Sequence, residues 1–272
     1  MFSWLHLDMR IYGINPVLEA LRAGRATLIR VSPRADERLT AVAQMAEEHR
    51  VTVRRVSPGE LDRLASGARH RHQGVVADVE DTRTFSVEDL VSAARGAPLI
   101  VVLDGIEDPR NVGAILRTVD AAGGDGVVRQ SRHAARLDGA AASASAGALA
   151  HVKIAEVVNI ARALEILKSA GVWTVGLAGD TPTHYDAIDL TLPTALVVGA
   201  EGTGLRRLVR ERCDWLVSIP MHGHVRSLNV SVAAGIALFE AARQRRTAPS
   251  SAGRSPSIAL TPLGLHEWHR TC

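Results

Sequence analysis

One uninterrupted apolar run limits what this chain can fold into. Residues Leu99–Asp104 read LIVVLD, five apolar side chains in a row without alternation. An alternating strand covers one face of a sheet, whereas a continuous run is typical of a strand buried on both faces, as in a parallel sheet flanked by helices. The sequence therefore predicts an α/β fold built around a strand at 99–104.

Helical and strand patterns alternate on both sides of this run. Before it we expect helices at 15–23, capped by Asn15, at 36–50 and from 57, with strands at 27–31, 51–56 and 75–79. After it we expect helices at 111–122, 161–170, 205–212 and 229–245, with strands at 126–128, 172–177, 195–199 and 215–219. This alternation predicts βαβ units and a mostly parallel sheet.

Composition divides the chain into five segments. Residues 1–9 lack a periodic pattern, residues 10–80 form a small α/β unit, and residues 81–97 mix charged residues with Ser and Gly, as linkers do. Residues 98–246 carry the larger α/β unit. Residues 247–272 include TAPSSAGRSPS, a composition that predicts disorder. A chain of 272 residues is long enough for two such units, each with its own core.

Arginine carries the positive charge of the chain. Lys153 and Lys168 are the only lysines among 32 Lys and Arg residues, which face 29 Asp and Glu, so the formal net charge is +3. This mild balance excludes an acidic solvating chain and a disordered polycation, but it names no partner. Because a guanidinium forks onto phosphate and stacks on bases, the positions of the arginines matter more than the total.

The two cysteines and the apolar runs indicate the cellular setting. Cys213 and Cys272 stand far apart and outside metal-ligand spacing, which argues against a disulfide framework and a zinc site. Cys213 lies between a helical run and an apolar strand, so we expect a buried free thiol. No apolar run approaches the roughly 20 residues of a membrane span, and the opening MFSWLHLDMR lacks a signal-peptide core. We expect a cytoplasmic protein without metal or membrane.

Three loops at the ends of predicted strands carry residues suited to chemistry, and open α/β sheets bind ligands at such ends. They are DGIEDPRNVGAILR at 104–117, GAEGTGL at 199–205 and IPMHGHVRSLN at 219–229. Each also has a structural interpretation: a glycine-rich turn, an exposed helix arginine at Arg117, or a helix cap at Asn229. Neither a P-loop nor the GxGxxG of a Rossmann enzyme is present in these loops, which argues against both classes.

Taken together, the loops resemble the SpoU/TrmH family of RNA ribose 2'-O-methyltransferases. The matching residues are Asn111, Gly113 and Arg117 in the first loop, Gly199, Glu201, Gly202 and Gly204 in the second, and Ile219, Pro220, Met221, Gly223, Ser227, Leu228, Asn229 and Ser231 in the third. Upstream, YGINPVLEAL near Tyr12 and HQGVVA from His72 resemble the amino-terminal RNA-binding domain of the branch that methylates guanosine in large-subunit (23S) ribosomal RNA.

This resemblance implies a SPOUT fold in a homodimer, with a parallel sheet whose carboxyl-terminal part is tied in a trefoil knot. Chain connections are normally un-knotted, so no periodic pattern predicts the knot. The last helix is compatible with a dimer, because Val230–Phe239 is apolar almost all round. Such a helix is either central to its domain or buried at a subunit interface.

The resemblance also implies S-adenosyl-methionine as the methyl donor. By position its contacts fall on Gly199, Ile219 and Leu228, with Glu201, Gly204, Met221 and Asn229 nearby. Glycines suit such a site because a chain without Cβ atoms can approach the ligand closely.

For catalysis, the resemblance assigns activation of the 2'-hydroxyl to Arg117. Arginine normally stays protonated, so we favour a role in which Arg117 grips the neighbouring phosphate and orients the hydroxyl; the role of proton acceptor stays open. Asn111 and Asn229 would hold substrate or cofactor by neutral hydrogen bonds, and Ser227 would orient it. Glu201 would brace the loops or serve as the fallback base.

RNA contacts are expected from arginines in the small unit and near the first loop, namely Arg54, Arg69, Arg71, Arg110 and Arg132. Residues 129–154 are richer in Arg and Ala than relatives, which often carry proline and threonines there. This departure leaves the contacts of Arg129, Arg132 and Arg136 open. The alternatives are a tRNA 2'-O-methyltransferase and a catalytically silent RNA-binding or ribosome-assembly factor on the same scaffold.

Overall fold

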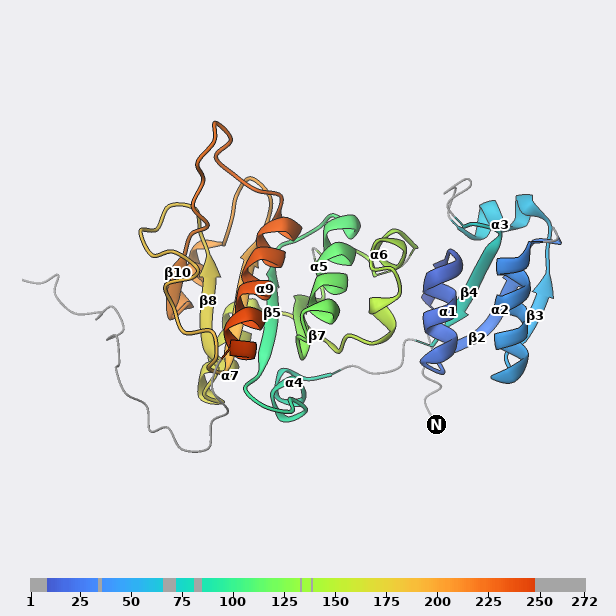
Figure 1. The fold of residues 1–272 in the computed structure, drawn as a ribbon, viewed down its shortest axis with the longest axis horizontal. Coiled ribbons are helices and arrows are strands. Elements are labelled where there is room, and N and C mark those ends of the chain that lie inside the picture. The colour runs from blue at the N-terminus through green and yellow to red at the C-terminus, as the bar shows by residue number, and fades with distance from the viewer. Residues whose placement is uncertain are drawn as a thin grey trace, which may run out of the picture.

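The chain folds around two separate sheets. The computed structural model describes residues 9–33, 36–65, 72–80, 85–132, 134–137 and 139–247. One sheet has four strands in the order β1-β4-β2-β3, and the other has six in the order β10-β8-β9-β5-β6-β7. Figure 1 shows the smaller sheet with its helices in blue and cyan at one end of the molecule. The predicted α/β class is confirmed.

The smaller sheet is mixed. Its elements are β1 (Met9–Tyr12), α1 (Ile14–Arg22), β2 (Ala26–Val31), α2 (Glu37–Glu48), β3 (Thr52–Arg55), α3 (Pro58–Leu64) and β4 (Val75–Val79). β2 and β3 are parallel, while β4 runs antiparallel to β1 and β2. Helices α1 and α2 pack on one face, and α3 covers Tyr12 and Val76 on the other. The first helix starts after Gly13, so Asn15 lies inside its first turn and does not cap it.

The larger sheet is parallel throughout. Its strands are β5 (Leu99–Asp104), β6 (Gly126–Gln130), β7 (Ile154–Val157), β8 (Trp173–Leu177), β9 (Thr194–Gly199) and β10 (Trp215–Val217). Its helical elements are α4 (Val87–Ser92), α5 (Pro109–Ala121), α6 (Gly139–Ala144), the 3₁₀ turn η1 (Ala148–Ala150), α7 (Ile160–Ser169), α8 (Arg207–Arg212) and α9 (Val230–Thr247).

Strand β5 lies inside the larger sheet and is buried on both faces, as the apolar run predicts. Val101 and Leu103 belong to the core that includes α5 and α9. Ile100 and Val102 belong to the core that includes α4 and α7. The two faces are therefore covered by different helices, and the ends of the strands stay open for a site.

Residues 81–97, which we expected to form a linker, include helix α4. The Ser86 hydroxyl accepts the Asp89 N–H at 3.0 Å, and the Asp89 carboxylate accepts the Ser86 N–H at 2.8 Å. This capping box starts a helix whose Val87 and Leu90 are buried against the larger sheet. The sequence pattern did not predict this helix, because a six-residue helix with two buried apolar side chains shows no clear period within a charged segment.

The sequence patterns also missed β1, α6 and β7. Met9, which we placed in an amino-terminal extension, pairs with Val79 in the smaller sheet. At the other end, α9 runs to Thr247, past the predicted domain boundary. Residues 1–8 and 248–272, including Cys272, lie outside the described residues.

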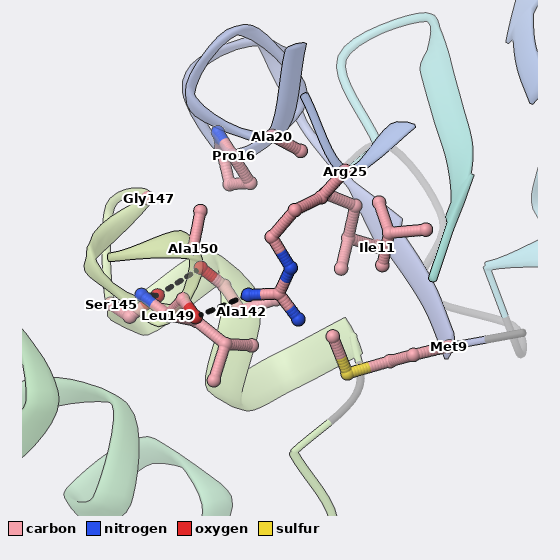
Figure 2. Close-up of a pocket in the computed structure, with 11 residues that line it drawn as sticks. Met9, Ile11, Pro16, Ala20, Arg25, Ala142, Ser145, Gly147, Leu149 and Ala150 are labelled. Carbon is pink, nitrogen blue, oxygen red and sulfur yellow. Dashed lines mark hydrogen bonds between the residues drawn. The ribbon is translucent and has the colours of Figure 1, made fainter. Parts of the chain in front are cut away.

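The two units contact each other through α1 and β1 on one side and α6 and η1 on the other. The Arg25 guanidinium donates from Nη1 to the Leu149 carbonyl oxygen at 2.9 Å, and Figure 2 shows this side chain lying between the units. His151 Nε2 lies 2.9 Å from Glu19 Oε2. The hydrogen bond from His151 lowers the pKa of Glu19.

Candidate active site

The candidate site lies at the carboxyl edge of the larger sheet, where β9, β5 and β6 end side by side. Asp104 stands opposite Gly199 in the β5–β9 register, and Gln130 is the last residue of β6. A cavity of about 490 Å³ opens at this edge, within the size range of small-molecule sites. Its lining consists of residues 104–108, Asn111, Gln130, Ala200, Glu201, Thr203, Gly204 and Arg206.

Three of the predicted residues meet beside this cavity. Asn229 Nδ2 donates to Asn111 Oδ1 at 3.0 Å and to Glu201 Oε1 at 2.5 Å. Asn229 Oδ1 accepts the backbone N–H of Ser231 at 2.9 Å and its hydroxyl at 2.6 Å. Asn229 therefore acts as a cap for α9 and also joins three loops that are distant in the sequence.

The loop after β9, residues 199–206, is closed on itself and is called the glycine loop below. Ala200 and Gly204 exchange two backbone hydrogen bonds of 3.1 and 2.9 Å. Gly202 and Gly204 have φ values of 79° and 68°, which favour glycine. A Cβ atom at Gly199 would lie only 2.1 Å from the carbonyl carbon of Gly204. Tight closure of the loop thus accounts for these glycines.

A buried ion pair anchors the end of the glycine loop. Asp104 is fully buried, with 0% of its surface exposed. Its Oδ2 accepts the backbone N–H of Arg206 at 2.8 Å, and its Oδ1 accepts the Arg206 Nε–H at 2.6 Å. The Arg206 Nη2 also lies 2.5 Å from Asp104 Oδ1, while about half of the side chain is exposed and lines the cavity. Sequence reasoning gave neither residue a role, although a carboxylate directly after a doubly buried strand was an available signal.

Arg117 is not brought into this cluster. It lies on an exposed part of α5 and forms no hydrogen bond or ion pair within the described ranges. Six residues separate it from Asn111, which rotates it by about 240° around the helix axis. Arg117 is thus accessible to a ligand, but it does not contact Asn111, Glu201 or Asn229.

Residues 219–228, called the open loop below, are arranged differently. Met221 is 39% exposed and Val225 is 67% exposed. Ser227 is also exposed, and Ile219 and Leu228 are half-buried. Among the described residues, none of these ten takes part in a hydrogen bond. Figure 1 shows the segment in orange, projecting beyond the ends of the strands. The contacts predicted at Ile219, Met221, Ser227 and Leu228 therefore stay a prediction, in a loop that no hydrogen bond within the described residues fixes.

The predicted RNA-binding arginines fall into two groups, and Arg129 differs from both. Arg54 on β3, Arg110 in the first turn of α5 and Arg132 after β6 are exposed. Arg69 and Arg71 lie outside the described residues. Arg129, whose role we left open, is buried, donates to the Ala135 carbonyl oxygen and has its pKa lowered by desolvation. Arg129 is therefore held within the protein, with its Nη1 atom left without a hydrogen-bond partner among the described residues.

The remaining sequence expectations concern the thiol, metals and membranes. The Cys213 thiol is free, donates to the Val209 carbonyl oxygen at 3.3 Å and has its pKa raised by burial to about 12. No three His, Cys, Asp or Glu side chains of the described chain are grouped closely enough to hold a metal ion. None of the helices described here is long and apolar enough to cross a membrane.

Each of the two units matches a known protein family. Residues 98–239 match the SpoU rRNA Methylase family, and residues 10–85 match the family described as RNA 2'-O ribose methyltransferase substrate binding. The 23S rRNA (guanosine-2'-O-)-methyltransferase RlmB of Pseudomonas syringae pv. tomato is 42% identical over 253 residues, which cover 91% of this chain and 98% of that protein.

Solved structures agree with the sequence matches. The SpoU methyltransferase AviRb from Streptomyces viridochromogenes, solved with AdoMet, has a TM-score of 0.74 and 27% identity, covering 88% of this chain and 91% of its own. The TrmH/SpoU tRNA modifying enzyme of A. aeolicus has a TM-score of 0.51 and 33% identity, covering 59% of this chain and 82% of its own. The chain belongs to the SpoU rRNA Methylase family.

Proposed function

We propose that this protein transfers the methyl group of S-adenosyl-methionine to the ribose 2'-hydroxyl of a guanosine in 23S ribosomal RNA. The junction of Asn111, Glu201 and Asn229 carries this proposal, because it brings the three motif loops together at one cavity. The near full-length similarity to an RlmB protein supports the substrate. The tRNA enzyme covers only 59% of this chain, which disfavours a tRNA substrate.

The residues around the cavity fit the proposed donor. The sulfonium and ammonium groups of S-adenosyl-methionine are cationic, and Glu201 of the glycine loop adds an exposed carboxylate to the lining. We assign donor binding to Gly199, Gly204 and Glu201 of the glycine loop, with Asn229 beside them and Ile219, Met221 and Leu228 from the open loop. When bound, the donor supplies an electrophilic methyl group.

The protein's own residues must then hold the 2'-hydroxyl and manage its proton. A proton-accepting arginine would need strongly perturbed surroundings, whereas Arg117 is exposed. We therefore propose that Arg117 grips a phosphate and orients the hydroxyl. Asn111 and Asn229 hold the reacting groups through amide hydrogen bonds, and Ser227 adds an orienting hydroxyl. Glu201, placed by its contact with Asn229, is the fallback proton acceptor.

We also propose a homodimer formed through α9. Val230, Ala234 and Leu238 of this helix are buried, whereas Val232 and Phe239 are 48% and 53% exposed. Apolar side chains exposed together on one helix indicate an interaction surface. A second copy of the chain, covering this face, would bury them.

The proposed domain roles follow the two sheets. We infer that residues 10–80 bind RNA through exposed arginines such as Arg54, and that residues 98–246 carry out the transfer, with 81–97 between them. The carboxyl-terminal chain passes from the edge strand β10 to α9, which contacts α5 and β9; we propose that this return forms the trefoil knot. A ribosomal RNA substrate favours a cytoplasmic location.

Incubation with methyl-labelled S-adenosyl-methionine and separate pools of 23S rRNA and tRNA tests the function. We expect label on the 2'-oxygen of one guanosine in 23S rRNA, located by mapping the modified nucleotide. Label confined to tRNA would overturn the substrate. No label in either pool, with RNA binding retained, would favour the silent RNA-binding factor.

Variants of Arg117 test its role. Arg117→Ala should abolish turnover while donor binding, measured by calorimetry, stays near normal. Undiminished methylation by Arg117→Ala would contradict any role in the reaction. Arg117→Lys should retain measurable activity if the side chain orients the phosphate, and complete loss of activity would favour proton acceptance.

A further inference from the structure

The side-chain carbonyl oxygen of Gln130 is buried without a partner among the described residues. Only 8% of this residue is exposed, and its Oε1 atom has no hydrogen-bond partner in the described chain. A buried polar atom left in this state is unfavourable, and most such atoms in proteins are hydrogen-bonded. Gln130 also lines the cavity of the candidate site. Because the residue is part of the cavity wall, rotation of its side-chain amide would bring the unused acceptor to a ligand bound there.

The sheet order separates Gln130 from the proposed donor loops. Strand β6, which Gln130 ends, lies beside β5 on the side away from β9. The glycine loop follows β9, and the open loop follows β10, which is further along the same side. Two strand spacings separate β6 from β9, about 10 Å. Gln130 therefore faces the part of the cavity that the methyl acceptor would occupy.

The chemistry of this part of the cavity favours a ligand that donates hydrogen bonds. Glu107 and Asp108 also line it, and both are acceptors when ionised. Arg129, next to Gln130, also has a buried atom without a partner, the donor Nη1, but Arg129 is not one of the residues that line the cavity. A phosphate has no proton to offer at neutral pH, whereas a base edge has N–H groups and a ribose has O–H groups.

We propose that Gln130 binds the target nucleotide of the RNA by accepting a hydrogen bond from an N–H of its base or an O–H of its ribose. This inference rests on the proposed function, because it requires an RNA nucleotide in the cavity. RNA-binding proteins commonly read unstacked bases through such edge contacts. Gln130 is thus assigned to substrate binding and not to the donor.

Gln130→Met tests the assignment, because it keeps the side-chain length and removes the amide. We expect kcat/KM for RNA to fall about tenfold, as for the loss of one hydrogen bond, with the dissociation constant for S-adenosyl-methionine unchanged. The melting temperature should stay the same or rise, since an unpaired buried acceptor is removed. Gln130→Glu keeps an acceptor and should recover part of the RNA affinity. Gln44→Met, at an exposed glutamine of α2, is the matched control.

Three results would overturn the assignment. A larger dissociation constant for S-adenosyl-methionine, with unchanged RNA kinetics, would assign the hydrogen bond to the methyl donor. A lower melting temperature with unchanged RNA kinetics would make Gln130 a structural residue. Wild-type kinetics in Gln130→Met would remove it from the site. If the wild type methylates no RNA, the proposed function fails; filter binding of RNA by wild type and Gln130→Met then decides whether Gln130 contacts RNA.

Discussion

The glycine loop and the open loop follow two strands of one sheet, yet they are built in opposite ways. The glycine loop is closed by two backbone hydrogen bonds between Ala200 and Gly204 and is anchored to the buried Asp104. The open loop exposes Met221 and Val225 and has no hydrogen bond within the described chain. One side of the candidate site is thus shaped before any ligand binds, while the other is left for a ligand or a second subunit to order.

Asn229 links the open loop to the glycine loop. It directly follows the open loop, caps α9 through Ser231 and contacts Glu201 of the glycine loop. Ordering a segment on binding reduces affinity, whereas a preformed segment adds no such penalty. We therefore expect substitutions in the glycine loop to affect both folding and donor binding, and substitutions in the open loop to affect binding alone.

The largest effect is expected from Gly199→Ala. The added Cβ would meet the backbone of Gly204 at 2.1 Å, and backbone cannot move aside as a flexible side chain can. We expect the free energy of unfolding to fall by about 3 kcal/mol and donor binding to be lost, as measured by thermal melting and calorimetry. Gly223→Ala in the open loop is the matched control, since a Cβ there meets no atom within 4 Å. Equal melting temperatures for both variants would remove the distinction between the loops.

Arg206→Ala should have the next largest effect. It leaves the buried Asp104 carboxylate without its cation, and such broken pairs are strongly destabilising. Because Arg206 is half exposed, we expect a loss of about 2 kcal/mol and faster hydrogen–deuterium exchange at the Ala200 and Gly204 amides. Arg207→Ala is the control, since the Arg207–Glu211 pair is exposed. Unchanged exchange in Arg206→Ala would show that the ion pair does not hold the loop.

Asn229→Ala should have a smaller effect on folding and a clear one on turnover. It removes the cap of α9, worth about 1 kcal/mol, together with the contacts to Asn111 and Glu201. Asn229→Asp keeps an acceptor for Ser231 but places a second carboxylate beside Glu201. We expect Asp to restore the melting temperature without restoring methylation. Recovery of both by Asp would reduce Asn229 to a helix cap.

The comparison of the loops also explains what the sequence could predict. The continuous apolar run predicted β5, because burial on both faces leaves a direct compositional signal. The motif spacing picked out Asn111, Glu201 and Asn229, which meet in the structure. Helix α4 and strands β1 and β7 were missed, since short elements contain too few residues to show a period.

The rest of the site depends on tertiary contacts that leave no local pattern. Asp104 and Arg206 are 102 residues apart, and their pairing follows from the order of strands and not from spacing. Gln130 is notable only because it is buried without a partner. Arg117 is separated from Asn111 and Asn229 because residues six positions apart point in different directions around the axis of α5. This offset can be derived from the sequence only when the helix boundaries are known.

Cys213 gives the smallest expected effect and the most local one. A Cβ at Gly176 would contact both the Cys213 sulfur and Leu205 at the end of the glycine loop. Burial raises the pKa of the thiol from 9.0 to about 12, so the folded state favours the protonated form. The stability contributed by Cys213 is complete below pH 9 and is lost as the pH rises toward 12. Cys213→Ala should remove this dependence from denaturation curves.

The rate of thiol labelling at Cys213 tests the contrast between the two loops. At pH 8 Cys213 should react slowly with iodoacetamide in the wild type, because the thiolate is the reactive form. Arg206→Ala should speed the reaction by loosening the neighbouring loop, whereas Gly223→Ala should not, and mass spectrometry of the Cys213 peptide separates it from Cys272. Equal acceleration in both variants would mean that the open loop also supports this region, and the contrast between a preformed loop and an open one would fail.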